Sequence, residues 1–419
     1  MRDRRRQTTA PSAWSGLWYD PAAHAVVALG ISQIIAWGTT LYALGVLGKP
    51  IAADTGWSQG LVFGGLTVGL LTSGAVSPVV GRLIDRRGGR AIMSLGSIAT
   101  AFGLVLLSLV AHPYAYLAVW VLLGVAMRLC LYDAAFAALV QVTPSRGRRA
   151  ISYLTLFGGF ASSIFWPIGH ALNGAVGWRQ TLLIFAAMNL LVCLPVHWVG
   201  LARREAVAAP EPTASAAAGG PVAMTTTLTG TSRTIAMALF SLIVAASAVV
   251  FGALAVHLVP ILEATGLAAA SAVLLASLKG VAQVLGRVWD LTLARAWHPI
   301  DVGRVSIACI PLSFLVLMLG GANFWSALSF TVLFGIANGL VTIMRGSVPL
   351  ALFGPAGYGE VLGLLATPYL LLAAIAPWAF ALVVEHYGYG VGEAVLLGAG
   401  LLSLVAMEVM AFWYRRLSR

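Results

Sequence analysis

The sequence has few charges, few cysteines and almost no lysine. Only 9% of its 419 residues are charged and 60% are hydrophobic, whereas a soluble domain carries charge on roughly a quarter of its residues. The three cysteines, Cys130, Cys193 and Cys309, each lie alone inside an apolar segment, so their spacing gives neither a disulfide framework nor a metal site. The composition therefore excludes an ordinary soluble domain.

What the sequence has instead is a series of apolar runs from one end to the other. Runs of about 20 residues indicate membrane-spanning α-helices, and the alternating ten-residue pattern of a membrane barrel is absent. We predict an all-α membrane protein with about twelve spans. The expected spans are 24–47, 59–81, 91–111, 115–141, 150–174, 179–201, 233–258, 267–292, 302–321, 324–346, 359–383 and 390–414.

The net charge of +11 does not indicate a nucleic-acid partner, because the arginines form short clusters between apolar runs and no basic face. Loops rich in Lys and Arg stay on the cytoplasmic side of a membrane. Both termini are therefore expected to be cytoplasmic. Arginine far outnumbers lysine (only Lys49 and Lys279), which favours a bacterial inner membrane. The clusters lie at 2–6, 82–90, 146–149, 203–204, 295–304 and 415–419.

The chain divides into two halves that resemble each other. "GRLID" (Gly81–Asp85) ends the second span and "GRVWD" (Gly286–Asp290) ends the eighth; Pro167 and Pro377 lie at matching depths in spans 5 and 11. Between the halves is a stretch rich in Ala, Pro, Thr and Gly, which is typical of a flexible linker. The expected parts are a cytoplasmic tail 1–23, a six-helix bundle 24–201, a cytoplasmic linker 202–232, a second six-helix bundle 233–414 and a tail 415–419.

The loop between spans 2 and 3 carries a family motif. Gly81-x-x-x-Asp85-Arg86-x-Gly88-Gly89-Arg90 resembles the signature loop of the major facilitator superfamily, and the duplicated six-span halves extend that resemblance over the whole chain. The resemblance implies a fold of two pseudo-symmetric six-helix bundles, and a secondary active transporter that works by alternating access. We also expect that the protein is not an enzyme, because no nucleophile–base pair appears in the sequence.

The resemblance further implies that the motif acts as a conformational latch. Gly81 would let span 2 approach a neighbouring helix, and Asp85 would accept hydrogen bonds from backbone amides where span 11 begins, near Gly359. Arg86 and Arg90 would pair with Asp85 and lipid phosphates. The second copy lacks the basic cluster, so we expect a weaker latch there. The predicted latch residues are Gly81, Asp85, Arg86, Gly88, Arg90, Gly286, Arg287 and Asp290.

Ionisable residues inside a span are functional candidates because their burial in the bilayer is costly. In span 4, Arg128 and Asp133 form either a substrate and proton site or a structural ion pair. In span 8, Lys279 binds an anion, pairs with Asp133 or is neutral. Arg345 in span 10 is interpreted as a gate or a lipid-facing residue. The predicted pathway residues are Arg128, Asp133, Lys279, Tyr132, Gln33, Trp37, Gln283 and Asn338.

Two functions remain open at this point. The excess of cations among the pathway residues favours proton-coupled symport of a small organic anion, as in the monocarboxylate branch that the chain partly resembles. The alternative is a proton-driven efflux antiporter for drugs or other toxic compounds, favoured by the "GGFASSIFWPIG" stretch of span 5. No nucleotide-binding glycine loop or metal-ligand cluster is present in the sequence, so we expect no cofactor and no metal. The expected partners are a small-molecule substrate, protons and the lipid bilayer, and we expect a monomer.

Overall fold

The computed structural model describes residues 20–203, 227–321 and 323–417. These residues form helices joined by short turns, and no strand occurs among them. Most of the predicted N-terminal tail and of the predicted linker lies outside the described residues. The predicted all-α membrane fold is confirmed.

The first half of the chain forms nine helical segments, which run from Pro21 to Gly200. The first begins at Pro21, where Asp20 accepts a hydrogen bond from the backbone amide of Ala22 at 3.0 Å. Proline in the first turn and an aspartate cap are both typical of a helix start. The segments are α2 (Pro21–Thr39), α3 (Ala43–Thr55), α4 (Gln59–Arg87), α5 (Gly89–Leu109), α6 (Pro113–Cys130), α7 (Tyr132–Val142), α8 (Gly147–Gly159), α9 (Ala161–Met188) and, after a π-helical turn (Asn189–Cys193), α10 (Leu194–Gly200).

The second half uses fewer and longer helices. Where the first half breaks its first, fourth and fifth spans, the corresponding helices here continue without interruption. The segments are α11 (Gly230–Ala264), α12 (Ala269–Thr292), α13 (Pro299–Gly320), α14 (Phe324–Phe353) and α15 (Tyr358–Leu417).

Ten segments of the described residues are long and apolar enough to cross a membrane. Two of them, Gly147–Gly200 and Tyr358–Leu417, contain two crossings each, because a glycine with non-helical backbone interrupts α9 at Gly177 (φ 80°) and α15 at Gly388 (φ 79°). Glycine adopts such positive φ angles without steric cost. The described residues therefore provide twelve crossings, and the two glycine breaks lie at equivalent places in the two halves.

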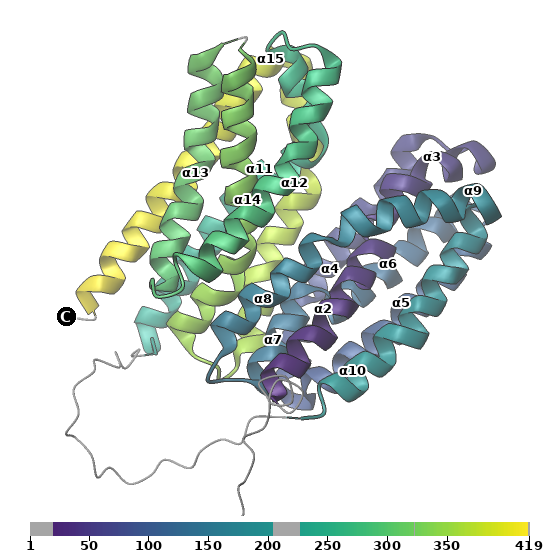
Figure 1. The fold of residues 1–419 in the computed structure, drawn as a ribbon, viewed down its shortest axis with the longest axis horizontal. Helices are drawn as coiled ribbons and strands as arrows, with labels where there is room; N and C mark the ends of the chain where they lie inside the picture. The colour runs from purple at the N-terminus through teal and green to yellow at the C-terminus, as the bar shows by residue number, and fades with distance from the viewer. Residues whose placement is uncertain (1–19, 204–226, 322, 418–419) are drawn as a thin grey trace, which may run out of the picture.

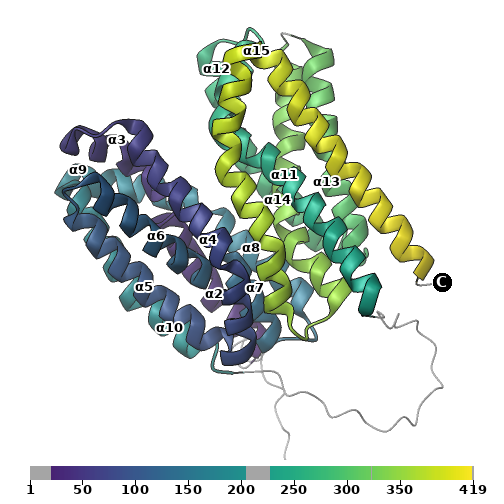
Figure 2. The same cartoon turned by 180° about the vertical axis from the view of Figure 1, so that it is seen from behind.

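The two halves meet at one end of the molecule and diverge toward the other, as Figure 1 and Figure 2 show from opposite sides. The meeting end contains the segments 82–90, 146–149 and 294–297, and we call it the arginine-rich end. The hydrophobic core there crosses between the halves, since Tyr358 and Leu362 of α15 pack into a cluster formed mainly by the first half. The main seam runs along α4 and α15, where Gly363 lies against the backbone of Ser77.

Candidate functional site

Three charged side chains from both halves meet between the bundles. Asp133 of α7 accepts two hydrogen bonds from Nη2 of Arg345 on α14, at 3.1 and 3.3 Å, and lies 3.9 Å from Nη1 of Arg128 on α6. The side chains are 13%, 16% and 2% exposed, respectively. We call these three residues the charge cluster. It contains two cations and one anion, and it ties the first half to the second.

A break in span 4 gives Asp133 its position. The helix stops at Cys130 and restarts at Tyr132, because Leu131 has an extended backbone (φ −82°, ψ −170°). Asp133 thereby lies in the first turn of α7, where the helix dipole favours a negative charge. Discontinuous helices form ligand and ion sites in many transporters.

Gln33 supports this break from span 1. Its Nε2 donates to the carbonyl of Cys130 at 2.7 Å, and its Oε1 accepts from Nε1 of Trp37 at 3.1 Å. Gln33 is fully buried. Both ends of its amide are bonded within the first half, and its ligand role stays a prediction.

Arg128 is the most deeply buried cation of the cluster. Its Nε donates to Oγ of Ser77 on α4 at 2.6 Å. Its Nη2, however, is buried and has no hydrogen-bond partner among the described residues. An unsatisfied buried donor is costly, so an anionic group reaching Nη2 would be bound favourably.

Aromatic rings line the first half beside the cluster. Trp37 lies 5.1 Å from Tyr132 and 6.0 Å from Tyr42 between ring centroids, and Tyr42 meets Trp166 edge to face at 6.2 Å. The Tyr132 hydroxyl donates to the carbonyl of Thr155 at 3.3 Å. In the second half, the guanidinium of Arg345 stacks on a further ring, Tyr369, at 3.7 Å.

Lys279 does not join the charge cluster. Its Nζ lies 5.8 Å from the ring centroid of Phe334 on α14, and no carboxylate pairs with it in the described part of the chain. The predicted option of a Lys279–Asp133 pair is therefore wrong, because the two arginines occupy Asp133. Gln283 and Asn338 are partly buried on α12 and α14, and neither side-chain amide has a described hydrogen bond.

The predicted contact of Asp85 is present at the arginine-rich end. Its two oxygens accept from the backbone amides of Gly359 at 2.9 Å and Glu360 at 2.7 Å, at the beginning of α15. A Cβ on Gly81 would collide with the carbonyl of Gly359, so only glycine permits this approach of α4 to α15. We call Gly81, Asp85, Gly359 and Glu360 the first latch.

The arginines of the motif do not pair with Asp85, contrary to the prediction. Arg86 is exposed, while Arg90 lies over the Trp198 ring at 4.0 Å. The two α15 amides already occupy the Asp85 carboxylate. Gly88 ends α4, with its amide bonded to the carbonyl of Ile84 at 2.8 Å.

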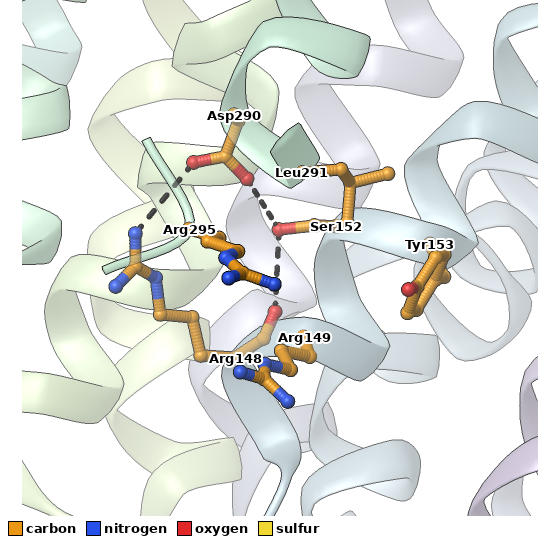
Figure 3. Close-up of a pocket in the computed structure, with 7 residues that line it drawn as sticks. All are labelled: Arg148, Arg149, Ser152, Tyr153, Asp290, Leu291 and Arg295. Carbon is orange, nitrogen blue, oxygen red and sulfur yellow. Dashed lines mark hydrogen bonds and ion pairs between the residues drawn. The ribbon is translucent and has the colours of Figure 1, made fainter. Parts of the chain in front are cut away.

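The second copy of the motif contacts α8 instead of a helix-start amide. Asp290 accepts from the Ser152 hydroxyl at 2.6 Å and lies 3.7 Å from Nη2 of Arg148 (Figure 3). Arg287 crosses to the first half and donates to the carbonyl of Thr155 at 2.7 Å. Gly286 packs against the carbonyl of Ile336, which belongs to its own half. We call Arg287, Asp290, Arg148 and Ser152 the second latch.

An ion pair also holds the beginning of α2 to the loop before α8. Both Nη atoms of Arg146 donate to the Asp20 carboxylate at 2.7 Å. The Arg146 hydrogen bonds lower the pKa of Asp20 below its usual value of 3.8. This contact lies within the first half and does not restrain the second.

Sequence reasoning missed several members of these contacts. Arg345 is a member of the charge cluster and not a gate or a lipid-facing residue, and the signal for this interior role is its charge inside a span. Ser152 and Arg148 gave no such signal, because a serine and a loop arginine are common at a helix start.

Comparisons with known proteins agree with one fold. A sequence profile described as the Major Facilitator Superfamily matches residues 29–300. The human organic anion transporter MFSD10 (TETRAN) has a similar crystal structure, with a TM-score of 0.68, 18% identity, and coverage of 93% of this chain and 100% of that chain. The proton:xylose symporter XylE, bound to 6-bromo-6-deoxy-D-glucose, gives a TM-score of 0.65 at 11% identity, over 93% of this chain and 95% of that chain. No curated protein sequence matches.

Proposed function

Because the chain belongs to the major facilitator superfamily, we propose that it is a proton-coupled secondary transporter of a small organic anion such as a monocarboxylate. One observation carries the proposal. Among the described residues, Arg128 and Arg345 share one carboxylate, Asp133, and Lys279 has no described carboxylate partner. Charges at membrane depth need a counter-charge, and a substrate anion would supply it.

We assign substrate binding to Lys279 and Arg128. Lys279 has no described carboxylate partner, and Nη2 of Arg128 has no described hydrogen-bond partner. A guanidinium recognises a carboxylate through parallel N–H donors, and an ammonium does so as a point charge. Trp37, Tyr132, Gln283 and Asn338 would shape the rest of the site.

We assign proton coupling to Asp133. Its carboxylate accepts both hydrogen bonds that bring Arg345 of the second half to the first half. Protonation would remove the negative charge that both arginines of the cluster contact. The halves would then separate more easily at the arginine-rich end.

Transport would proceed by rocking of the two bundles about this site. By the positive-inside rule, we place the arginine-rich end and both termini in the cytoplasm, in a bacterial inner membrane. The arrangement described above is then closed to the cytoplasm. We further propose that the transporter acts as a monomer.

The proton role is tested in proteoliposomes with Asp133→Asn. We expect uptake and efflux of a carboxylate to lose their dependence on an imposed pH gradient, while Asp54→Asn, which changes an aspartate away from the cluster, keeps it. Full pH dependence in the Asp133→Asn protein would remove Asp133 from the mechanism.

The substrate class is tested by thermal unfolding with a panel of carboxylates and of hydrophobic cations. We expect carboxylates to raise the unfolding temperature, and Lys279→Gln to abolish that rise. Lys49→Gln is the matched control, since Lys49 is the other lysine in the sequence. Stabilisation by hydrophobic cations alone would favour the alternative, a drug efflux antiporter.

A further inference from the structure

A small cavity of about 110 Å³ opens beside the second latch. Its walls come from both halves, namely the first two turns of α8 on one side and the end of α12 with the following turn on the other (Figure 3). Three arginines line it. They are Arg148, Arg149 and Arg295.

The charges in this cavity do not balance. Asp290 is the only acidic residue among the cavity's lining residues, and it is held by Ser152 at 2.6 Å and by Arg148 at 3.7 Å. Arg149 and Arg295 have no described carboxylate partner and are exposed. The cavity therefore holds two arginines whose charge is not matched by the protein residues described.

The first latch shows why this space exists. There, Gly81 lets α4 touch the start of α15, and Asp85 accepts two backbone amides directly. At the second latch, Gly286 packs within its own half, and Asp290 reaches a side-chain hydroxyl. The start of α8, a helix of 13 residues, thus retains its positive dipole end facing the cavity.

We infer that this cavity binds a phosphate group, from either a soluble phosphate compound or a lipid headgroup. Arginine forks match phosphate oxygens in charge and geometry, and basic pockets between membrane helices bind anionic headgroups. Asp290 opposes an anion; the Ser152 hydroxyl donates to its Oδ2, and Arg148 lies 3.7 Å from its Oδ1, which has no described hydrogen bond. Arg149 and Arg295 are the residues that bind the phosphate.

Bound phosphate would also hold the two halves together. Arg149 belongs to the first half and Arg295 to the second, so they meet only while the arginine-rich end is closed. A ligand that binds one state shifts the equilibrium toward it by its differential affinity. The phosphate therefore acts as a brake on opening at that end.

Binding is tested with the full chain in phosphatidylcholine nanodiscs. One arm adds inorganic phosphate at constant ionic strength, and the other replaces part of the lipid with phosphatidylglycerol. The variant is Arg149→Gln/Arg295→Gln, and the matched control is Arg203→Gln, an exposed arginine elsewhere at the same end. Unchanged unfolding without phosphate would show that the double variant is folded.

We expect a saturable rise in unfolding temperature that the double variant loses, with at least a tenfold weaker apparent affinity, and that the control retains. A response to inorganic phosphate identifies a soluble ligand, and a response to phosphatidylglycerol alone identifies a lipid. Equal responses in all three proteins, or none in either arm, would overturn the inference. No transport substrate is used, so the result is independent of the proposed substrate class.

The conformational effect is tested with spin labels at Leu109 and Leu319. Both residues are exposed and lie in the last turn of a helix on the splayed side, Leu109 in α5 and Leu319 in α13. The phosphate probe that binds should increase the population with the longer label distance. If the distance distribution does not change on binding, the inference that bound phosphate opposes opening of the arginine-rich end is wrong.

Discussion

Single residues of the charge cluster carry more than one physical task. Asp133 is at once the carboxylate nearest two arginines and the contact between halves. Gln33 supports the helix break next to Asp133 by donating to the carbonyl of Cys130. The geometry of the cluster therefore depends on a neutral side chain that contacts none of its charges.

We predict that Gln33→Leu destabilises the protein by about 1–3 kcal/mol. The substitution leaves the buried Cys130 carbonyl and the Trp37 indole without their partners, and an unsatisfied buried polar group costs about that much. Thermal or denaturant unfolding in detergent measures it. Gln59→Leu, at an exposed glutamine, should change stability much less, and equal losses in the two variants would contradict the assignment.

The presence of charged residues in the interior could be predicted from the sequence, but their partners could not. A lone charged residue inside an apolar span is easily recognised in the sequence. Which carboxylate it meets depends on how far each helix is rotated and how the halves approach. Arg345 reaches Asp133 and Lys279 does not, and nothing in the local sequence of either residue distinguishes them.

For the helices, too, some features can be predicted from the sequence and others cannot. Spans of about 20 apolar residues and the two glycine breaks near Gly177 and Gly388 follow from composition and turn chemistry. The break at Phe160 directly follows Gly158 and Gly159, and glycine weakens a helix. The break at Leu131 has no glycine, proline or polar run beside it, and it is stabilised by a tertiary contact, the bond from Gln33 to Cys130.

At the level of elements, the two motif glycines should respond differently to alanine. A Cβ at Gly81 meets the carbonyl of Gly359 in the other half, whereas a Cβ at Gly286 meets that of Ile336 in its own half. Overpacking costs about 1–3 kcal/mol. Gly81→Ala should therefore shorten the Leu109–Leu319 label distance by opening the arginine-rich end.

Gly286→Ala serves as the matched comparison for that prediction. Its cost falls inside the second half, so it should lower the unfolding temperature with little change in the label distance. If the two variants shifted the distance distribution equally, the claim that only Gly81 controls the contact between the halves would be refuted.

At the scale of the whole molecule, the halves are similar in fold but unequal in their contacts. One latch joins a carboxylate to backbone amides with no space between helices, and the other leaves an arginine-lined cavity. Alternating access needs the closed and open states to lie within a few kcal/mol of each other. The first latch joins the two halves at the arginine-rich end, outside the charge cluster. It can therefore change the balance of the closed and open states without touching the proposed binding site.

We therefore expect Asp85→Asn to slow transport while leaving substrate affinity nearly unchanged. The neutral amide loses the favourable interaction of a charge with the start of α15, worth up to about 2 kcal/mol when partly buried, which corresponds to a change of about 5–30-fold in the balance of states. Initial uptake rates and equilibrium binding, measured on one preparation, separate the two effects. Glu263→Gln is the control, since Glu263 is an exposed carboxylate outside the latch. A large loss of substrate affinity in Asp85→Asn would mean that the first latch and the binding site are energetically coupled. The proposal that the latch controls the conformational equilibrium and the centre controls binding would then be wrong.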